Sequence, residues 1–141
     1  EWLRGLWKGR LILKGIQEAD DAIAASEVGA DGLVVSNHGG RQLDSVHSSI
    51  AKLPEVVAAV GERMEVYVDG GVRSGLDVFK AVALGARGVM IGRPWAWALA
   101  AGGEAAIAGL LATFKKELEV AMALAGVTTI RQIRPDQIDL I

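Results

Sequence analysis

The chain has 141 residues, of which 51% are hydrophobic and 18 are glycine, enough for one globular domain with a buried core. It has no cysteine and only two histidines, which excludes disulfides, thiolate metal sites and histidine-rich metal sites, and we expect no metal. The formal net charge of −2 gives no general attraction to nucleic acid, so no nucleic-acid partner is expected.

Four short apolar runs, each followed by glycine or polar residues, recur along the first two thirds of the chain. They lie at Leu11–Leu13, Leu33–Val35, Val66–Val68 and Val89–Ile91. Such runs are typical of buried parallel strands. Between them, apolar residues at helical spacing predict helices over 19–28, 53–60 and 76–83, and a last helix is predicted over about 103–125.

Local signals agree with this alternation. Ser74, with an acidic residue three positions later, resembles a capping box, while Gly29 and Gly85 stand where a helix would end in a left-handed cap. The segment Val-Gly-Ala-Asp-Gly at 28–32 recurs as Leu-Gly-Ala-Arg-Gly at 84–88. Repeated strand and helix units are expected of a (β/α)8 barrel of typically ~250 residues, so four units and a C-terminal helix predict half of a barrel.

In such a barrel, functional groups gather at the C-terminal ends of the strands. Polar and glycine residues follow each predicted strand here: Lys14 at the end of the first, 36–41 after the second, 69–73 after the third and 92–93 after the fourth. We expect all four groups to face one mouth. The last two loops would form a phosphate cradle from glycine amides and a helix N-terminus, with charge added by Arg73 and Arg93.

The segment Ser36-Asn37-His38-Gly39-Gly40-Arg41 carries the most specific chemistry. His38 is a candidate base, and Arg41 could hold a carboxylate through two parallel charge-assisted hydrogen bonds. The alternative is an ordinary glycine turn with an exposed histidine and arginine.

Four motifs together resemble the FMN-dependent 2-hydroxy acid oxidases and dehydrogenases, which include glycolate oxidase, L-lactate dehydrogenase and mandelate dehydrogenase. The motifs are Leu13-Lys14-Gly15, the segment from Ser36 to Asp44, Val68-Asp69-Gly70-Gly71-Val72-Arg73 and Ile91-Gly92-Arg93-Pro94. The resemblance implies an α/β fold in which residues 1–141 are the C-terminal half of an FMN-binding TIM barrel, with the N-terminal half absent. It also implies a homo-oligomer, either a tetramer or an octamer.

The resemblance implies a role for each site residue. His38 removes a proton from the substrate and Arg41 binds its carboxylate, while Lys14 stabilises charge on the flavin. Ser36 would hydrogen-bond the isoalloxazine and Asp69 the ribityl chain, and Gly70 belongs to the same FMN site. The phosphate would be bound by Gly71, Arg73, Gly92 and Arg93.

The expected function is therefore FMN-dependent oxidation of a small L-2-hydroxy acid to the 2-oxo acid, by a chain that needs an upstream half to be active. Two alternatives remain: another FMN-binding barrel enzyme, such as a type 2 isopentenyl diphosphate isomerase, or a noncatalytic half-barrel. No apolar stretch approaches the ~20 residues that cross a bilayer, which predicts a cytoplasmic protein. Membrane association through the absent upstream loop is the alternative location.

Overall fold

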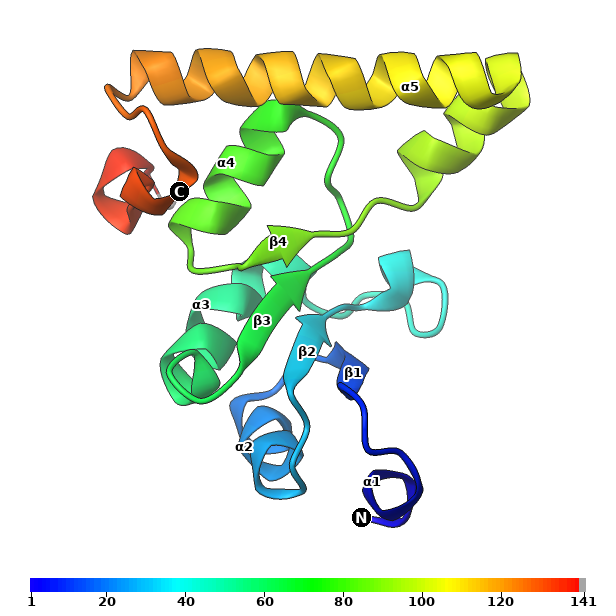
Figure 1. The fold of residues 1–141 in the computed structure, drawn as a ribbon, viewed down its shortest axis with the longest axis vertical. Coiled ribbons are helices and arrows are strands. Elements are labelled where there is room, and N and C mark those ends of the chain that lie inside the picture. The colour runs from blue at the N-terminus through cyan, green and yellow to red at the C-terminus, as the bar shows by residue number, and fades with distance from the viewer. Residues whose placement is uncertain (140–141) are drawn as a thin grey trace.

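A four-stranded parallel sheet forms the centre of the structure, a computed structural model that describes residues 1–139. Its order is β1-β2-β3-β4, with bounds Ile12–Ile16, Gly32–Val35, Glu65–Val68 and Gly88–Val89. Successive strands are joined through α2 (Ala19–Glu27), α3 (Ser49–Val60) and α4 (Gly75–Ala83), as Figure 1 shows. The predicted alternation of strand and helix is confirmed.

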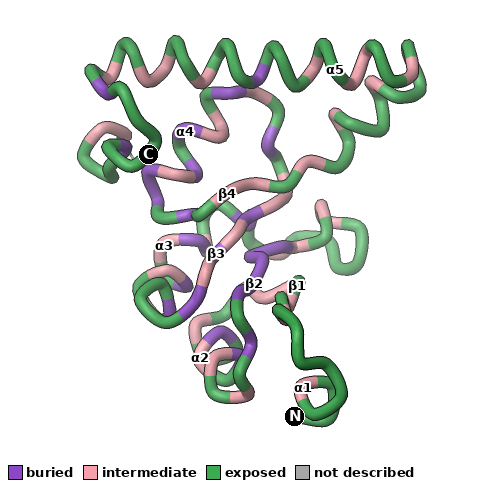
Figure 2. Tube along the Cα trace, viewed as in Figure 1, coloured by how far each residue is buried: buried purple, intermediate pink, exposed green. Residues whose placement is uncertain are grey.

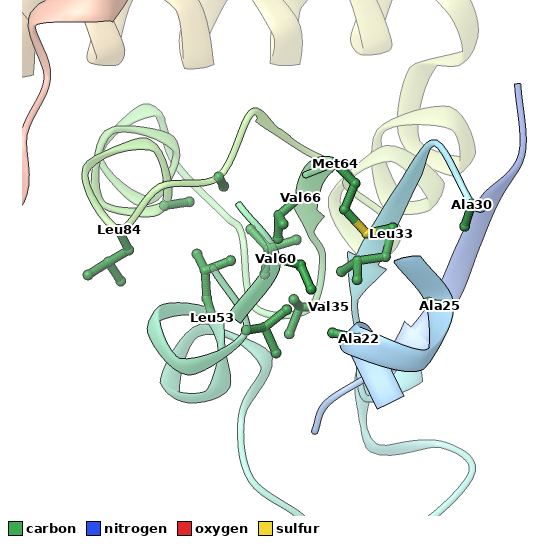
Figure 3. Close-up of a cluster of buried hydrophobic side chains, with 14 residues drawn as sticks. Ala22, Ala25, Ala30, Leu33, Val35, Leu53, Val60, Met64, Val66 and Leu84 are labelled. Carbon is green, nitrogen blue, oxygen red and sulfur yellow. The ribbon is translucent and has the colours of Figure 1, made fainter. Parts of the chain in front are cut away.

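The main core lies between the sheet and helices α2 and α3 (Figure 3). Leu33 and Val35 of β2 and Val66 of β3 point into it, against Leu53 and Val60 of α3, and all five are at most 3% exposed. Full burial of one such side chain stabilises a fold by about 1.5–3 kcal/mol. Because these side chains are buried, the strands appear in the sequence as short apolar runs.

The opposite face of the sheet carries the alternate residues and no covering helix within residues 1–139. Ile12 is 48% exposed there and Met90 45%. The Tyr67 hydroxyl donates to the Glu65 carboxylate at 2.8 Å, which lowers the pKa of Glu65 and raises that of Tyr67. In a closed barrel this face of the sheet lines the interior, which side chains fill. The four-stranded sheet therefore corresponds to an open half of a barrel.

The repeated glycine segments end two helices in the same way. Val28 after α2 and Leu84 after α4 both have φ −80° and ψ 5°, and the following Gly29 and Gly85 have φ +81° and +96°. These left-handed glycines turn the chain directly into the next strand. The predicted caps at Gly29 and Gly85 are therefore confirmed. Ser74 is the N-cap of α4, since its hydroxyl accepts the Asp77 amide, but the reciprocal bond of a capping box does not form, because the Asp77 carboxylate accepts the Arg73 amide and the Ser74 hydroxyl.

The last helix differs most from its prediction, because α5 spans Arg93–Leu124 and begins ten residues early. Gly102 and Gly103 leave helical conformation and bend it, as Figure 1 shows. By length and composition α5 could cross a membrane, which corrects the expectation that no apolar stretch reaches that size. Most of it is exposed or half-buried, with Phe114 as its buried residue (Figure 2).

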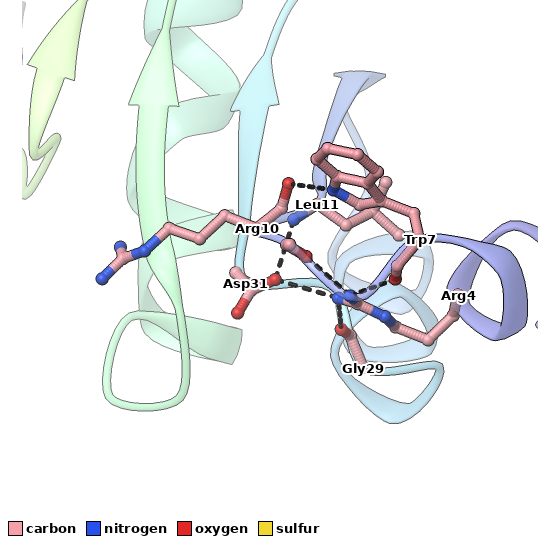
Figure 4. A network of polar contacts seen from close by, with 7 residues as sticks. Arg4, Trp7, Arg10, Leu11, Gly29 and Asp31 are labelled. Carbon is pink, nitrogen blue, oxygen red and sulfur yellow. Dashed lines mark hydrogen bonds and ion pairs between the residues drawn. The ribbon is translucent and has the colours of Figure 1, made fainter.

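The N-terminus forms a short helix, α1 (Trp2–Leu6), for which the sequence analysis made no prediction. Arg4 of α1 donates to the Gly29 carbonyl at 3.1 Å and to the Asp31 carboxylate at 3.0 Å (Figure 4). Asp31 also accepts the Leu11 amide, and this bond and Arg4 lower the pKa of the carboxyl. The network ties α1 to the start of β1 and β2, at the opposite end of the sheet from the predicted mouth.

Candidate active site

A cavity of about 590 Å³ opens at the C-terminal ends of the strands. It is lined by every predicted site residue except Ser36: Lys14, His38, Arg41, Asp69, Gly70, Gly71, Arg73, Gly92 and Arg93. The loops after β2, β3 and β4 and the side chain from β1 therefore meet as expected. Parallel strands bring these ends together because their carboxyl ends share one edge of the sheet.

The Lys14 side chain links β1 to the residues that follow β2 and β3. Its ammonium lies 2.8 Å from the Ser36 hydroxyl and 2.7 Å from Asp69 Oδ2. The position differs from the prediction, because β1 continues to Ile16 and Lys14 lies inside the strand on its uncovered face. The lysine reaches the mouth through the length of its side chain, not by standing at the strand end.

The second carboxylate oxygen of Asp69 has no partner within residues 1–139, although it is buried. A buried unsatisfied acceptor costs about 1–3 kcal/mol. Since Oδ1 belongs to a residue that lines the cavity, it marks a place for a hydrogen-bond donor from a bound molecule.

Ser36 is 1% exposed and does not line the cavity. Its oxygen accepts hydrogen bonds from the Lys14 ammonium and from the His38 amide, at 2.8 and 3.1 Å. One hydroxyl thus links the predicted flavin lysine to the predicted base, and only its own hydrogen remains to be donated to a ligand.

His38 begins a one-turn 3₁₀ helix, His38–Gly40, and has φ +55°, a left-handed conformation uncommon outside glycine. The preceding Asn37 holds this turn: its side-chain oxygen accepts the Gly39 amide at 2.9 Å, and its backbone amide donates to Ser49 at 3.1 Å. A strained residue at a cavity suggests a functional position.

Cations dominate the cavity, which contains Lys14, Arg41, Arg73 and Arg93 against the single carboxylate of Asp69. Within the described part of the chain, Arg41 and Arg73 form no ion pair. Arg93 reaches toward the carbonyl of Gly39, at 3.5 Å. The site is therefore suited to a ligand with more than one negative group.

Of the two helices that follow the last two loops, α4 has an N-terminus that is already occupied, whereas the first residues of α5, 93–96, line the cavity. The Gly75 amide at the start of α4 donates to the Glu117 carboxylate of α5 at 2.7 Å, and the Arg73 amide donates to Asp77 at 2.9 Å. These donors cannot also bind a phosphate. The predicted phosphate ligands that remain are Gly71, Gly92 and the arginine side chains.

Sequence reasoning missed three residues that support the site: Asn37, Ser49 and Glu117. An asparagine two residues before a glycine is a recognisable turn signal, so Asn37 could have been found. Ser49 is 1% exposed, and its hydroxyl lies near Gly70, where an added Cβ would stand 3.1 Å from it. Neither Ser49 nor Glu117 had a local signal, because their partners lie far along the chain.

Comparison with known proteins identifies the family. The model of the FMN-dependent dehydrogenase family matches residues 1–140. An L-lactate dehydrogenase of Caulobacter vibrioides (strain NA1000 / CB15N) is 58% identical over 133 residues, which cover 94% of this chain and 35% of the relative. An L-lactate dehydrogenase of Pseudomonas syringae pv. syringae is 53% identical over 133 residues, with the same coverage.

Solved structures of mandelate oxidase are similar in fold. A mutant with the monooxide FMN adduct has a TM-score of 0.91 and 49% identity, and the match covers 94% of this chain and 42% of that one. Mandelate oxidase with benzoyl-formic acid gives a TM-score of 0.90 and 49% identity, over 94% of this chain and 39% of that one. The chain thus spans about a third of the length of its curated relatives.

Proposed function

Since the chain belongs to the FMN-dependent dehydrogenase family, we propose that it forms the catalytic part of an enzyme that oxidises a small L-2-hydroxy acid to the 2-oxo acid. The sequence relatives are named for L-lactate, and lactate has one carboxylate and one carbinol carbon. We therefore propose L-lactate as the first substrate to assay.

FMN is the cofactor of this family, and the cavity fits it. The unsatisfied Asp69 Oδ1 offers an acceptor for a ribityl hydroxyl, and the excess of cations suits a phosphate. Gly71 and Gly92 leave their backbone open, because a Cβ at either would meet no heavy atom of the described residues within 4 Å. These observations support roles for Gly71, Arg73, Gly92 and Arg93 at the phosphate and for Gly70 beside them. The role of Ser36 at the isoalloxazine stays a prediction, because Ser36 is buried and does not line the cavity.

The conversion removes two electrons and two protons from the substrate, and FMN, when bound, supplies the acceptor for both electrons and one proton. His38 takes the other proton on an imidazole nitrogen. Arg41 binds the substrate carboxylate and so orients the carbinol carbon. Lys14 provides positive charge where reduction leaves negative charge on the flavin.

The observation that carries this proposal is the meeting of His38, Arg41, Lys14 and Asp69 at one cavity. The same geometry supports the need for an upstream half. Within residues 1–139 no hydrogen bond holds the imidazole of His38, whereas a general base requires an orienting partner. The uncovered face of the sheet also lacks the strands that would close a barrel.

Comparing this chain alone with the longer protein that contains it tests the proposal. We expect the longer protein to show flavin absorbance and to oxidise L-lactate, and the chain alone to show little turnover, because its base is unoriented and its barrel open. Turnover by the chain alone would contradict the need for an upstream half. A longer protein that binds FMN but oxidises no 2-hydroxy acid would contradict the function and favour an isomerase, and one that binds no flavin would favour the noncatalytic half-barrel.

Arg41→Lys in the longer enzyme should raise KM for the 2-hydroxy acid roughly 10- to 100-fold. The lysine keeps the charge but loses the paired hydrogen bonds, and a hydrogen bond to a charged group contributes about 1.5–3 kcal/mol. Steady-state kinetics measures the change. Arg131→Lys, on an exposed arginine outside the cavity, is the matched control and should leave KM unchanged; an unchanged KM in Arg41→Lys would remove the clamp assignment.

The assembly and location of the whole enzyme are part of the proposal. We propose a homo-oligomer, a tetramer or an octamer, which light scattering of the longer protein would measure. A cytoplasmic location, with membrane association through an upstream loop as the alternative, is tested by fractionating cells that express it.

A further inference from the structure

We infer that Gly15 is a positioning residue for His38, because its missing side chain leaves the space in which the imidazole lies. A Cβ placed on Gly15 would stand 2.7 Å from His38 Cε1, 3.5 Å from Nε2 and 3.7 Å from Nδ1. Real Cβ atoms essentially never approach another heavy atom within 3.0 Å. The ring edge that carries both nitrogens therefore lies directly against the glycine. The inference rests on the proposed role of His38 as the base.

The backbone of β1 is irregular at this residue. Lys14 pairs with Val34 and Ile16 with Val35, so Gly15 is the extra residue of a bulge, and its φ is +98°. Glycine inside a strand weakens it and often marks a bulge or a close approach. Here the bulge accompanies a close approach to His38, the neighbour nearest to the space above Gly15.

Two hydrogen bonds fix the backbone of the turn that carries His38. Its amide donates to the buried Ser36 hydroxyl at 3.1 Å, and the next amide, that of Gly39, donates to Asn37 at 2.9 Å. A methyl group on Gly15 would therefore displace the imidazole ring, because the turn that carries it is fixed by two hydrogen bonds. A misplacement of about 1 Å in a reacting group can lower the rate 10²-fold.

The test is Gly15→Ala in the complete FMN-loaded enzyme, with Gly126→Ala as the matched control. Gly126 also has a positive φ, +71°, but within residues 1–139 a Cβ there meets no heavy atom within 4 Å, so the control places alanine at a left-handed position without the contact. We expect Gly15→Ala to shift the Cε1–H nuclear magnetic resonance signal of His38, assigned by its loss in His38→Gln. We also expect kcat to fall roughly 10²-fold, with KM little changed because Arg41 is untouched.

An unmoved His38 signal in Gly15→Ala overturns the inference, whether or not activity falls, as does an equal shift in Gly126→Ala. Should Gly15→Ala fail to fold, the unmodified enzyme decides: a nuclear Overhauser contact between Gly15 Hα and His38 Hε1 supports the inference, and its absence overturns it. A shifted signal in an enzyme that oxidises no 2-hydroxy acid would reject the proposed function and leave the contact established.

Discussion

His38→Gln should lower the kcat for 2-hydroxy acid oxidation by roughly 10²- to 10⁴-fold while FMN stays bound. The range is that of a lost general base, and glutamine cannot take up the proton. The predicted cofactor ligands are other residues, all of them lining the cavity except Ser36, so flavin absorbance of the purified variant should equal that of the unmodified enzyme. Stopped-flow flavin reduction measures the chemical step.

Two further variants separate chemistry from conformation. His38→Asn removes the base but keeps a residue that accepts the left-handed φ of +55° comparatively well, and it should lose as much activity as His38→Gln. His47→Gln changes the other histidine, whose backbone carbonyl, not its ring, accepts the bonds from Gln17 and Asn37, and it should keep full activity. Normal flavin reduction in both His38 variants would remove the base assignment.

Gly75→Ala should destabilise the protein by about 3 kcal/mol or more. A Cβ at Gly75 would stand 2.2 Å from the Phe114 carbonyl oxygen and 2.4 Å from the Leu118 amide nitrogen, both backbone atoms of α5. Overpacking of this kind typically costs 1–3 kcal/mol, and separation of the helices would also weaken the bond from the Gly75 amide to Glu117. The midpoint of urea unfolding measures the loss.

Gly109→Ala, on the facing helix α5, is the control for an added methyl group. Within residues 1–139 a Cβ at Gly109 meets no heavy atom within 4 Å, and alanine is the better helix former by about 1 kcal/mol. This variant should therefore unfold at the same or a higher urea concentration than the unmodified protein. Equal midpoints for Gly75→Ala and the unmodified protein would show that α5 does not pack this closely on α4.

The parts of the fold that could be predicted depend on neighbouring residues. The apolar strand Leu33–Val35 and the left-handed caps at Gly29 and Gly85 were readable because burial on one sheet face and a positive φ leave local patterns. The start of α5 was missed because Gly102 and Gly103 read as a helix boundary, whereas the structure bends the helix there and continues it.

The candidate site was predictable as a set of residues, since the carboxyl ends of parallel strands must share one edge. Its internal contacts were not. Lys14 lies inside β1, and the buried Ser36 hydroxyl accepts hydrogen bonds from its ammonium and from the His38 amide, an arrangement that residue types alone do not specify.

By itself the sequence determined the α/β alternation, the family motifs and the edge of the sheet where His38 and Arg41 gather, because each is encoded over a few neighbouring residues. Only the tertiary structure decided which donors remain free and where each side chain lies. The Glu117 carboxylate, 42 residues along the chain, accepts the Gly75 amide at the start of α4, and Gly15 leaves room for His38. Such contacts depend on packing between distant segments, which a local pattern does not record.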